Sequence, residues 1–290
     1  MAGNRKKITE AIMEGAIRLS GIATIAFVIL ILALLLQNGL PVFRYTSVRD
    51  LLLGTDWLPL SGVFGALPLI LASLLVTAGA AAIAIPLGVA VAVYIAEVAP
   101  PWVKEVLKPT VETLAAIPSV VIGFIGLLVL APFVQRIFDL PTGLTAFTGS
   151  IMLAFMALPT IVSIAEDAIT AVPLEYRAAS LALGATRWQA IRTVVVPAAR
   201  SGIFAGAMLG IGRVIGETMA VLMVTGNAAV IPRTIFEPVR TMTATIAAEM
   251  GETVQYSPHY FALFAVGLVL FAITFAINLL ADLALHRSET

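Results

Sequence analysis

The chain has 290 residues, of which 60% are hydrophobic and 12% are charged, and its formal net charge is zero. Its mean hydropathy is +1.04, whereas a soluble domain has about 25% charged residues. The composition therefore excludes an ordinary soluble domain and indicates a membrane protein with several spans. There is no cysteine, which excludes disulfides, thiolate metal sites and cysteine nucleophiles.

Two further classes of site are disfavoured by the sequence. The only two histidines, His259 and His286, are far apart, so we expect no metal site. The chain contains no Gly-x-x-x-x-Gly-Lys-Ser/Thr loop, so it does not bind ATP by that route. We also expect no catalytic residues and no cofactor in this chain.

Six stretches are long and apolar enough to cross a bilayer, whose core takes roughly 20 helical residues. They are residues 17–36, 66–95, 111–138, 145–165, 201–225 and 260–285. The first follows a short basic segment, but its apolar run is longer than that of a signal peptide and has no small-x-small cleavage site, so we expect a retained helix. Prolines at positions 68, 86, 118 and 159 interrupt the spans, which favours a packed bundle with a cavity.

The expected fold is an all-α polytopic membrane protein with six transmembrane helices. Residues 1–65 would form the N-terminal tail, the first helix and an external loop. Residues 66–285 would form a core of five helices with a cytoplasmic loop at 166–200, and 286–290 a cytoplasmic tail. If the N-terminus is cytoplasmic, eleven Lys and Arg residues lie inside and five outside, so both termini are predicted to be cytoplasmic.

The cytoplasmic loop between the fourth and fifth spans has the pattern of two short helices. After Pro173, apolar residues recur on one helical face, and Gly184 occupies the position that follows a helix end. Thr186 and Gln189 have the spacing of a capping box, which starts a second helix, and Pro197 ends or kinks it. Two interpretations stay open: an amphipathic segment on the lipid surface, or a rigid corner to which a cytoplasmic partner docks.

Arg213 and Glu217 place two charges inside the fifth apolar span. At 1.5 Å per residue, Arg213 lies about 18 Å along this span, near the middle of the bilayer, where a charge costs roughly 2.5–3.5 kcal/mol. The two residues could form a structural i, i+4 ion pair. Gly206 and Gly210 share their helical face, with Gly202 just beyond its edge, so these glycines either let a helix approach closely or open a path beside a cation.

Other polar residues are weaker candidates. Glu166, Asp167 and Asp282 are expected to mark span ends, and Glu112 begins the third span. Thr218 and Ser119 are possible hydroxyl donors to an anion in the pathway. The external loops 38–65 and 226–258 are expected to be solvated, and they contain Trp57, Arg233, Arg240, Glu249 and Glu252.

The segment "RAASLALGATRWQAIRTVVVP" resembles the EAA loop of ABC-importer permeases. In that family the loop forms the coupling helix that contacts the ATP-hydrolysing subunit. The resemblance extends to Ala179, Gly184, Ala185 and Pro197, with Thr186 at the start of the second helix. The family's usual glutamate is Ala178 here, and Glu175, one turn earlier, could replace it.

The stretches "LAAIPSVVIGFIGLLVLAP", "ALPTIVSIAEDAITAVP" and "GRVIGETMAV" resemble phosphate-specific permeases of the PstC type, and the likeness runs from about residue 50 to the C-terminus. The resemblance implies a type I ABC-importer permease in the bacterial inner membrane that moves inorganic phosphate by alternating access. It also implies a homologous PstA-type permease, two ATPases that bind ATP and Mg²⁺ and dock on residues 173–193, and a phosphate-binding protein that contacts the external loops.

Phosphate chemistry favours a pathway role for Arg213, because a guanidinium binds an oxyanion bidentately and keeps its charge. Glu217 would weaken the binding enough for transit. Three alternatives remain: a permease for sulfate or molybdate, a secondary carrier driven by an ion gradient, and a membrane-embedded enzyme. The carrier lacks the expected internal repeat, and the enzyme lacks a metal cluster or a nucleophile with a base.

Overall fold

A computed structural model describes the backbone of residues 2–287 and the side chains of residues 13–283. Within that range the regular secondary structure is helical apart from one short hairpin, and irregular loops join some of the helices. The elements are α1 (Ala2–Gly39), η1 (Leu40–Arg44), α2 (Val48–Leu53), β1 (Trp57–Leu58), η2 (Pro59–Ser61), β2 (Val63–Phe64), α3 (Leu67–Val93), η3 (Tyr94–Val98), α4 (Pro101–Ala115), α5 (Ser119–Ile125), η4 (Gly126–Leu130), α6 (Ala131–Ile137), α7 (Ala146–Thr170), α8 (Leu174–Ala182), α9 (Arg187–Ala190), η5 (Ile191–Val195), α10 (Val196–Ala198), α11 (Arg200–Ile215), α12 (Met219–Val224), α13 (Met242–Glu249) and α14 (Pro258–Arg287).

Among the described residues, five helical segments are long and apolar enough to span a membrane: residues 13–44, 67–98, 119–137, 146–170 and 258–283. A sixth is obtained if residues 187–198 and 200–215 form one span with a bend of 68°. The expectation of an all-α polytopic protein is therefore confirmed. Four of the six predicted windows agree closely with these segments, and the windows 111–138 and 201–225 do not.

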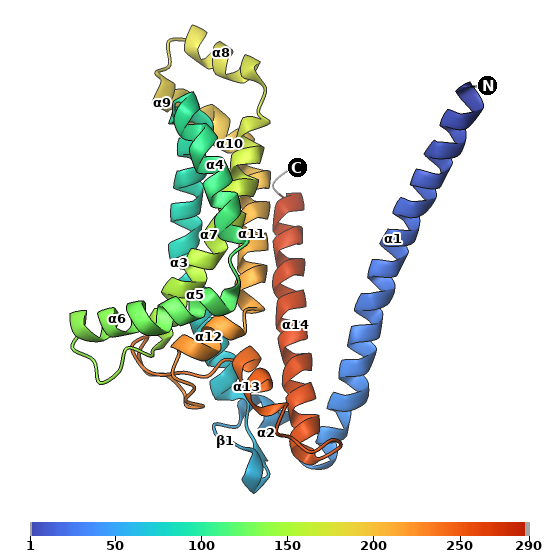
Figure 1. The fold of residues 1–290 in the computed structure, drawn as a ribbon, viewed down its shortest axis with the longest axis vertical. Coiled ribbons are helices and arrows are strands. Elements are labelled where there is room, and N and C mark those ends of the chain that lie inside the picture. Colours follow the sequence, from blue (N-terminus) through green and yellow to red (C-terminus); the bar gives the residue numbers. More distant parts are fainter. Residues whose placement is uncertain (1, 288–290) are drawn as a thin grey trace.

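Helix α7 lies at the centre of the bundle, between α3, α4 and α11 (Figure 1). Small residues let the helices approach: a Cβ added to Gly88 of α3 would lie 2.7 Å from Ile161, and one added to Gly79 would lie 2.4 Å from Ser150. Such close approach increases the dispersion contacts on which helix association in lipid depends. The consequence is a tightly packed core around α7.

Helix α1 leaves this bundle and extends away from it beside α14 (Figure 1). The two helices are closest where Gly39 meets the backbone of Ala265, 3.2 Å from the position of an added Cβ. Large apolar side chains of α1, such as Ile17, Ile25 and Phe27, are more than 60% exposed. These residues are therefore available to lipid or to another chain.

The predicted third span is interrupted. Helix α4 ends at Ala115, and α5 begins only at Ser119, after Pro118. A proline disfavours helical conformation in the residue before it, which explains the break at Ile117. Figure 1 shows α5 and α6 running across the bundle rather than along it, so the prediction of one helix over 111–138 was wrong.

The predicted fifth span is also interrupted. Helix α11 ends at Ile215, with Gly216 at its C-cap, and α12 begins at Met219. The prediction of one helix over 201–225 was therefore wrong. The interruption separates Arg213, in the last turn of α11, from Glu217, which lies outside both helices.

The two ends of the molecule differ in character. The α8–α9 corner lies at the same end as the start of α1 and the end of α14, and the β1–β2 hairpin with α2 and α13 lies at the other (Figure 1). At the hairpin end, Trp57, Phe64 and Leu69 pack with Leu263 and Val266 of α14. At the corner end, Ala92, Ala165 and Ile169 pack with Val195 and Ala199.

Candidate functional site

Arg213 lies where α4, α7 and α11 meet. Its Nη1 donates to Thr160 Oγ1 of α7 and its Nη2 to the carbonyl of Ala115 at the end of α4, both at 3.3 Å. The residue is exposed, and within the described part of the chain no carboxylate lies within ion-pair distance of it. Ser119 begins α5 four residues beyond Ala115. The guanidinium therefore faces the break between α4 and α5 with its charge uncompensated by any described acidic side chain.

Glu217 does not pair with Arg213. Its Oε1 accepts from the backbone N–H of Ala220 at 3.3 Å, so it caps the first turn of α12, where a negative charge is favoured. Its own carbonyl accepts from the Thr243 hydroxyl at 2.9 Å, and the Thr218 hydroxyl donates to Gly216 O at 3.2 Å. The expectation that both charges share one helical face was wrong, because the helix ends between them.

The glycines of α11 serve close packing. A Cβ added to Gly202 would lie 2.3 Å from Ala168 Cβ, and one added to Gly210 would lie 2.5 Å from Ile161 Cγ1; at Gly206 the nearest atom, of Ile164, would be 3.2 Å away. All three neighbours belong to α7. Of the two predicted roles of these glycines, the structure shows close packing of two helices. This packing fixes the position of α11, which carries Arg213, relative to α7.

A second charged group joins α4 to the C-terminal end of α7, near the α8–α9 corner. Glu166 has a side chain only 3% exposed, yet it lies 2.6 Å from Lys108 Nζ and 3.3 Å from Lys104 Nζ. Lys108 also contacts Asp167 at 2.8 Å, and the Thr170 hydroxyl donates to Glu166 Oε1 at 3.0 Å. Hydrogen bonds to Asp167 and Glu166 raise the pKa of Lys108 above its ordinary value, despite some desolvation.

Glu166 and Asp167 lie near the end of α7 and Asp282 lies near the end of α14, as expected for residues that mark span ends. The structure adds that Glu166 is buried and ion-paired, whereas Asp167 is 65% exposed and Asp282 is exposed. No residue of α4 is buried, so its attachment to α7 depends strongly on the lysines. Glu112, also on α4, is exposed and lines a small cavity with Lys108 and Glu166. A buried glutamate of this kind could not be found from the sequence, because its two lysines are about 60 residues away.

The predicted two-helix corner is present as α8 and α9. Gly184 has φ +86° at the corner, a left-handed conformation that favours glycine. The capping box is complete: Thr186 N–H donates to Gln189 Oε1 at 2.8 Å, and Gln189 N–H donates to Thr186 Oγ1 at 3.3 Å. Pro173 lies at the N-cap of α8, and Pro197 lies in α10 just before the 68° bend.

The corner presents apolar side chains outward. Leu174 is 77%, Leu183 90% and Trp188 62% exposed. The residues expected to contact an ATPase are also accessible: Glu175, Ala178, Ala179, Gly184, Thr186 and Pro197 are exposed, and Ala185 is half-buried. The corner is thus a compact projection with an apolar surface at the end of the molecule.

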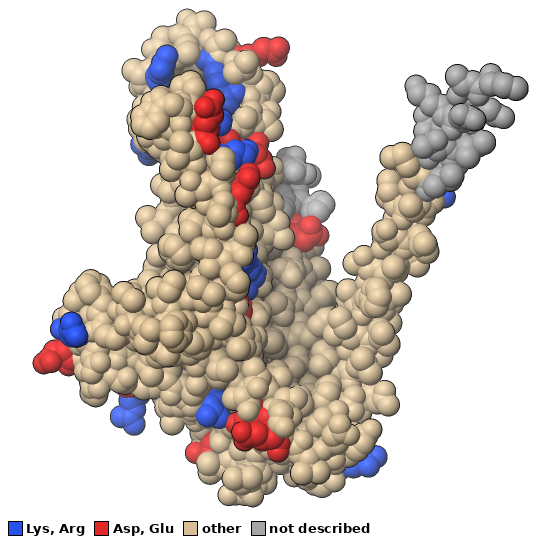
Figure 2. Space-filling view, in the orientation of Figure 1, with Lys and Arg blue, Asp and Glu red and all other residues tan. Residues whose placement is uncertain are grey.

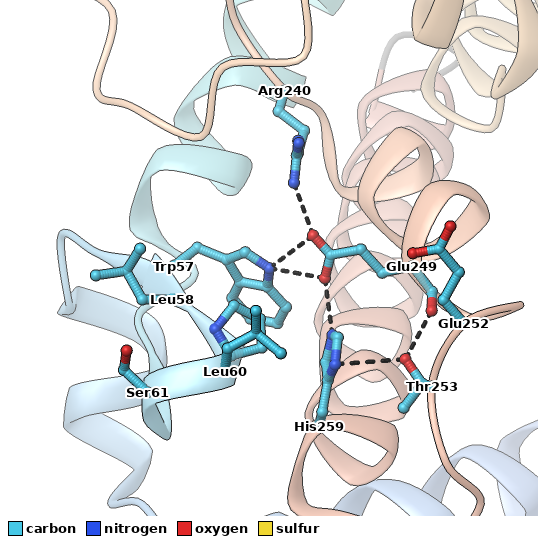
Figure 3. Close-up of a pocket in the computed structure, with 10 residues that line it drawn as sticks. Trp57, Leu58, Leu60, Ser61, Arg240, Glu249, Glu252, Thr253 and His259 are labelled. Atoms are coloured by element: carbon cyan, nitrogen blue, oxygen red, sulfur yellow. Dashed lines mark hydrogen bonds and ion pairs between the residues drawn. The ribbon is translucent and has the colours of Figure 1, made fainter.

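At the opposite end, residues expected to be solvated form a connected network (Figure 3). Glu249 accepts from Trp57 Nε1 at 3.0 Å and lies 2.7 Å from Arg240 Nη1 and 2.8 Å from His259 Nε2. Trp57 is only 4% exposed. These residues line a cavity of about 450 Å³ together with the tip of the β1–β2 hairpin.

The expectation of solvated loops was therefore wrong for Trp57, Arg240 and Glu249, whereas Arg233 and Glu252 are exposed. The only indication of this network in the sequence was the presence of a tryptophan and a glutamate in two different polar loops. His259 pairs with Glu249, and nowhere in residues 13–283 do three His, Cys, Asp or Glu side chains form a group that could hold a metal. His286, the other histidine, lies beyond the described side chains.

Residues 84–289 match the family described as binding-protein-dependent transport system inner membrane component. Among curated proteins, the chain is 43% identical over 247 residues to a probable ABC transporter permease protein, YqgH, of Bacillus subtilis, covering 84% of this chain and 80% of that protein. It is 38% identical to the phosphate transport system permease protein PstC of Mesorhizobium japonicum, covering 81% and 77%. With PstC of Haemophilus influenzae the identity is 32%, covering 92% and 91%.

Two solved structures show the same fold at low sequence identity. A bacterial alginate ABC transporter, in complex with a periplasmic protein bound to an alginate pentasaccharide, has a TM-score of 0.66 at 16% identity, covering 97% of this chain and 96% of that one. An inward-facing MetNI methionine ABC transporter has a TM-score of 0.58 at 19% identity, covering 75% and 93%. The resemblance to ABC-importer permeases is confirmed, and the chain belongs to the family of inner-membrane components of binding-protein-dependent transport systems.

Proposed function

We propose that this chain is the membrane-spanning permease subunit of an ATP-driven importer of inorganic phosphate. Several of the relatives at 32–38% identity are named as phosphate transport system permease protein PstC. The observation that carries the proposal is Arg213, an exposed guanidinium at the junction of α4, α7 and α11. Its bonds to neutral oxygens at 3.3 Å are long for charge-assisted bonds, so phosphate oxygens can replace them.

The substrate pathway would use Arg213 together with hydroxyl groups near the α4–α5 and α11–α12 breaks. Ser119 begins α5, and Thr218 precedes α12, so both lie at interruptions where backbone groups are also available. A planar guanidinium forms two parallel bonds to an oxyanion and stays charged throughout. Glu217 would act from a distance, by lowering the local positive potential rather than by pairing with Arg213.

Energy for transport would come from partner subunits. In this proposal two ATPases bind ATP and Mg²⁺, and each permease presents its α8–α9 corner, residues 173–193, to one of them. The exposed Leu174, Leu183 and Trp188 support this role, since a surface made only to rest on lipid would not require a glycine corner with a complete capping box. This chain itself would need no cofactor and would have no catalytic residue.

The remaining partners follow from the same assembly. A homologous permease of the PstA type would complete the pathway, and an external phosphate-binding protein would deliver the substrate at the end formed by the hairpin and α13. Both termini would be cytoplasmic, in agreement with the excess of basic residues on that side and with the position of the corner at the same end of the molecule as the start of α1 (Figure 1). ATP-driven movement of the corner would tilt the helices around Arg213 and give alternating access.

Reconstitution tests the proposal. The chain is co-expressed with its homologous permease, ATPase and binding protein, and uptake of labelled phosphate and of labelled sulfate into proteoliposomes is compared with and without ATP. We expect ATP-dependent uptake of phosphate and little uptake of sulfate. ATP-dependent uptake of sulfate or molybdate instead would contradict the phosphate assignment, and phosphate uptake by this chain alone, without the ATPase, would indicate a secondary carrier.

A further inference from the structure

Arg177, on the first helix of the corner, is bonded to two membrane-core elements at once. Its Nε and Nη2 donate to Glu97 Oε1 at 2.9 and 2.6 Å. Nη2 also donates to the carbonyl of Ile169 at 2.9 Å, and Nη1 donates to the carbonyl of Val172. One side chain therefore joins α8 to the end of the α3–η3 helix and to the end of α7.

The groups that accept hydrogen bonds from Arg177, at the end of α7 and on Glu97, are both suited to a positive charge. Ile169 lies in the last turn of α7, and Val172 lies just beyond it. The final carbonyl groups of a helix have no partner within the helix, and the negative end of the helix dipole favours a positive charge. Glu97 lies in the π-helical segment η3 that ends the α3 span. The Arg177 and Glu97 side chains are only 18% and 11% exposed, so water screens the pair less than it would a surface pair.

The rest of α8 has little attachment to the core. Ser180 is its only buried residue, and Leu174, Tyr176 and Leu183 are exposed. The second helix of the corner is held differently, because it continues through η5 into α11 and buries Val195 and Ala199 against Ala92 and Ala165. Without Arg177, α8 would be attached through Gly184 on one side and the short 171–173 link on the other.

We propose that Arg177 is a positioning residue that transmits displacement of the corner to the cytoplasmic ends of α3 and α7, with Glu97 as its receiving group. A helix held only by its chain links can rotate about them, whereas a helix that is also held by side-chain bonds carries with it the elements to which it is bonded. The contact makes the first helix of the corner move with α3 and α7, while η5 makes the second move with α11. This inference rests on the proposed function, in which the corner receives the movement of an ATPase.

The test measures phosphate uptake and ATP hydrolysis in the same proteoliposomes containing the complete transporter. Arg177→Met removes all four donated bonds at similar side-chain length, and Glu97→Gln keeps an acceptor but removes its charge. We expect uptake per ATP hydrolysed to fall at least tenfold for Arg177→Met and two- to fivefold for Glu97→Gln. Hydrolysis stimulated by the binding protein should stay within twofold of the original protein.

The matched control is Arg18→Met, which breaks a pair with Glu14 at 2.6 Å whose side chains are 76% and 64% exposed. Uptake per ATP should be unchanged in this variant. If the Arg177→Met complex does not assemble, Glu97→Gln decides, because Glu97 lies outside the corner. Unchanged uptake per ATP in an intact variant complex, or an equal fall in uptake and hydrolysis, would overturn the inference.

The same measurements separate the two proposals. If the unmodified complex imports no phosphate with ATP, the proposed function fails, and the coupling ratio is then measured with whichever oxyanion the complex does import. If the unmodified complex imports phosphate and the Arg177 and Glu97 variants keep its uptake per ATP, only the inference about Arg177 fails.

Discussion

At the scale of single residues, the local chain path decided what each charge does. Arg213 and Glu217 have the spacing of a helical ion pair, yet Gly216 ends α11 between them. Glu217 caps α12, and Arg213 is left with neutral acceptors. A positive charge without a carboxylate partner is costly within a membrane, and Arg213 is exposed at the junction of α4, α7 and α11, so we propose that it binds an anionic ligand.

Arg213→Ala should lower phosphate uptake at least tenfold while the assembled complex is retained. The reason is the loss of charge-assisted bonds, each worth about 1.5–3 kcal/mol, and about 1.4 kcal/mol corresponds to a factor of ten. Uptake is measured at equal amounts of complex. Arg136→Ala, which changes an exposed arginine at the end of α6, is the control, and full uptake by Arg213→Ala would contradict the pathway role.

At the scale of elements, three glycines of α11 allow it to pack closely against α7. Gly202, Gly206 and Gly210 each face α7, and a Cβ at the first and last of these would overlap its side chains. The spacing of four residues was visible in the sequence. Which helix faces the row was not visible, because periodicity identifies a face and not its neighbour.

Gly210→Ala should therefore destabilise the protein, by about 1–3 kcal/mol as is typical of overpacking. Gly212→Ala is the matched control on the same helix, since an added Cβ there would meet no atom within 4 Å. Because alanine favours helix over glycine by roughly 1 kcal/mol, we expect Gly212→Ala to be neutral or stabilising. Thermal unfolding in detergent compares the two, and equal midpoints would mean that the α7–α11 contact is not tight.

At the scale of the whole molecule, a cluster of charged side chains lies at each end of the bundle. Lys104 and Lys108 hold Glu166 at the end near the corner, and Trp57, Arg240 and His259 hold Glu249 at the hairpin end. Figure 2 shows acidic and basic side chains gathered near both ends, with fewer on the surface between them. The clusters share no residue and stabilise different pairs of elements.

Glu166→Gln and Glu249→Gln should each lower the thermal unfolding midpoint, since each removes a charge that two basic groups contact. Combined in one chain, their free-energy effects should add to within about 0.5 kcal/mol, as is usual for distant sites. Asp167→Asn is the control, because the Asp167 side chain is 65% exposed and surface pairs contribute about 0–1 kcal/mol. A combined effect far from the sum would indicate that the two ends are energetically coupled.

Local signals in the sequence predicted a large part of the fold. Apolar length identified α1, α3, α7 and α14, and the capping box with Gly184 identified the α8–α9 corner, because each of these depends on residues close together in the chain. Proline and glycine positions indicated interruptions, but their consequence at Pro118 and Gly216 depended on neighbouring helices. The family resemblance stood on the same local motifs and is confirmed by the relatives.

Contacts between distant residues were decided only by the tertiary structure. Glu97 with Arg177, Glu166 with Lys108, and Trp57 with Glu249 are separated by 80, 58 and 192 positions. Charge and apolarity in a sequence determine which residues avoid lipid and which spans form. Partner choice depends on which helices small residues allow to approach, and that is a property of the packed bundle.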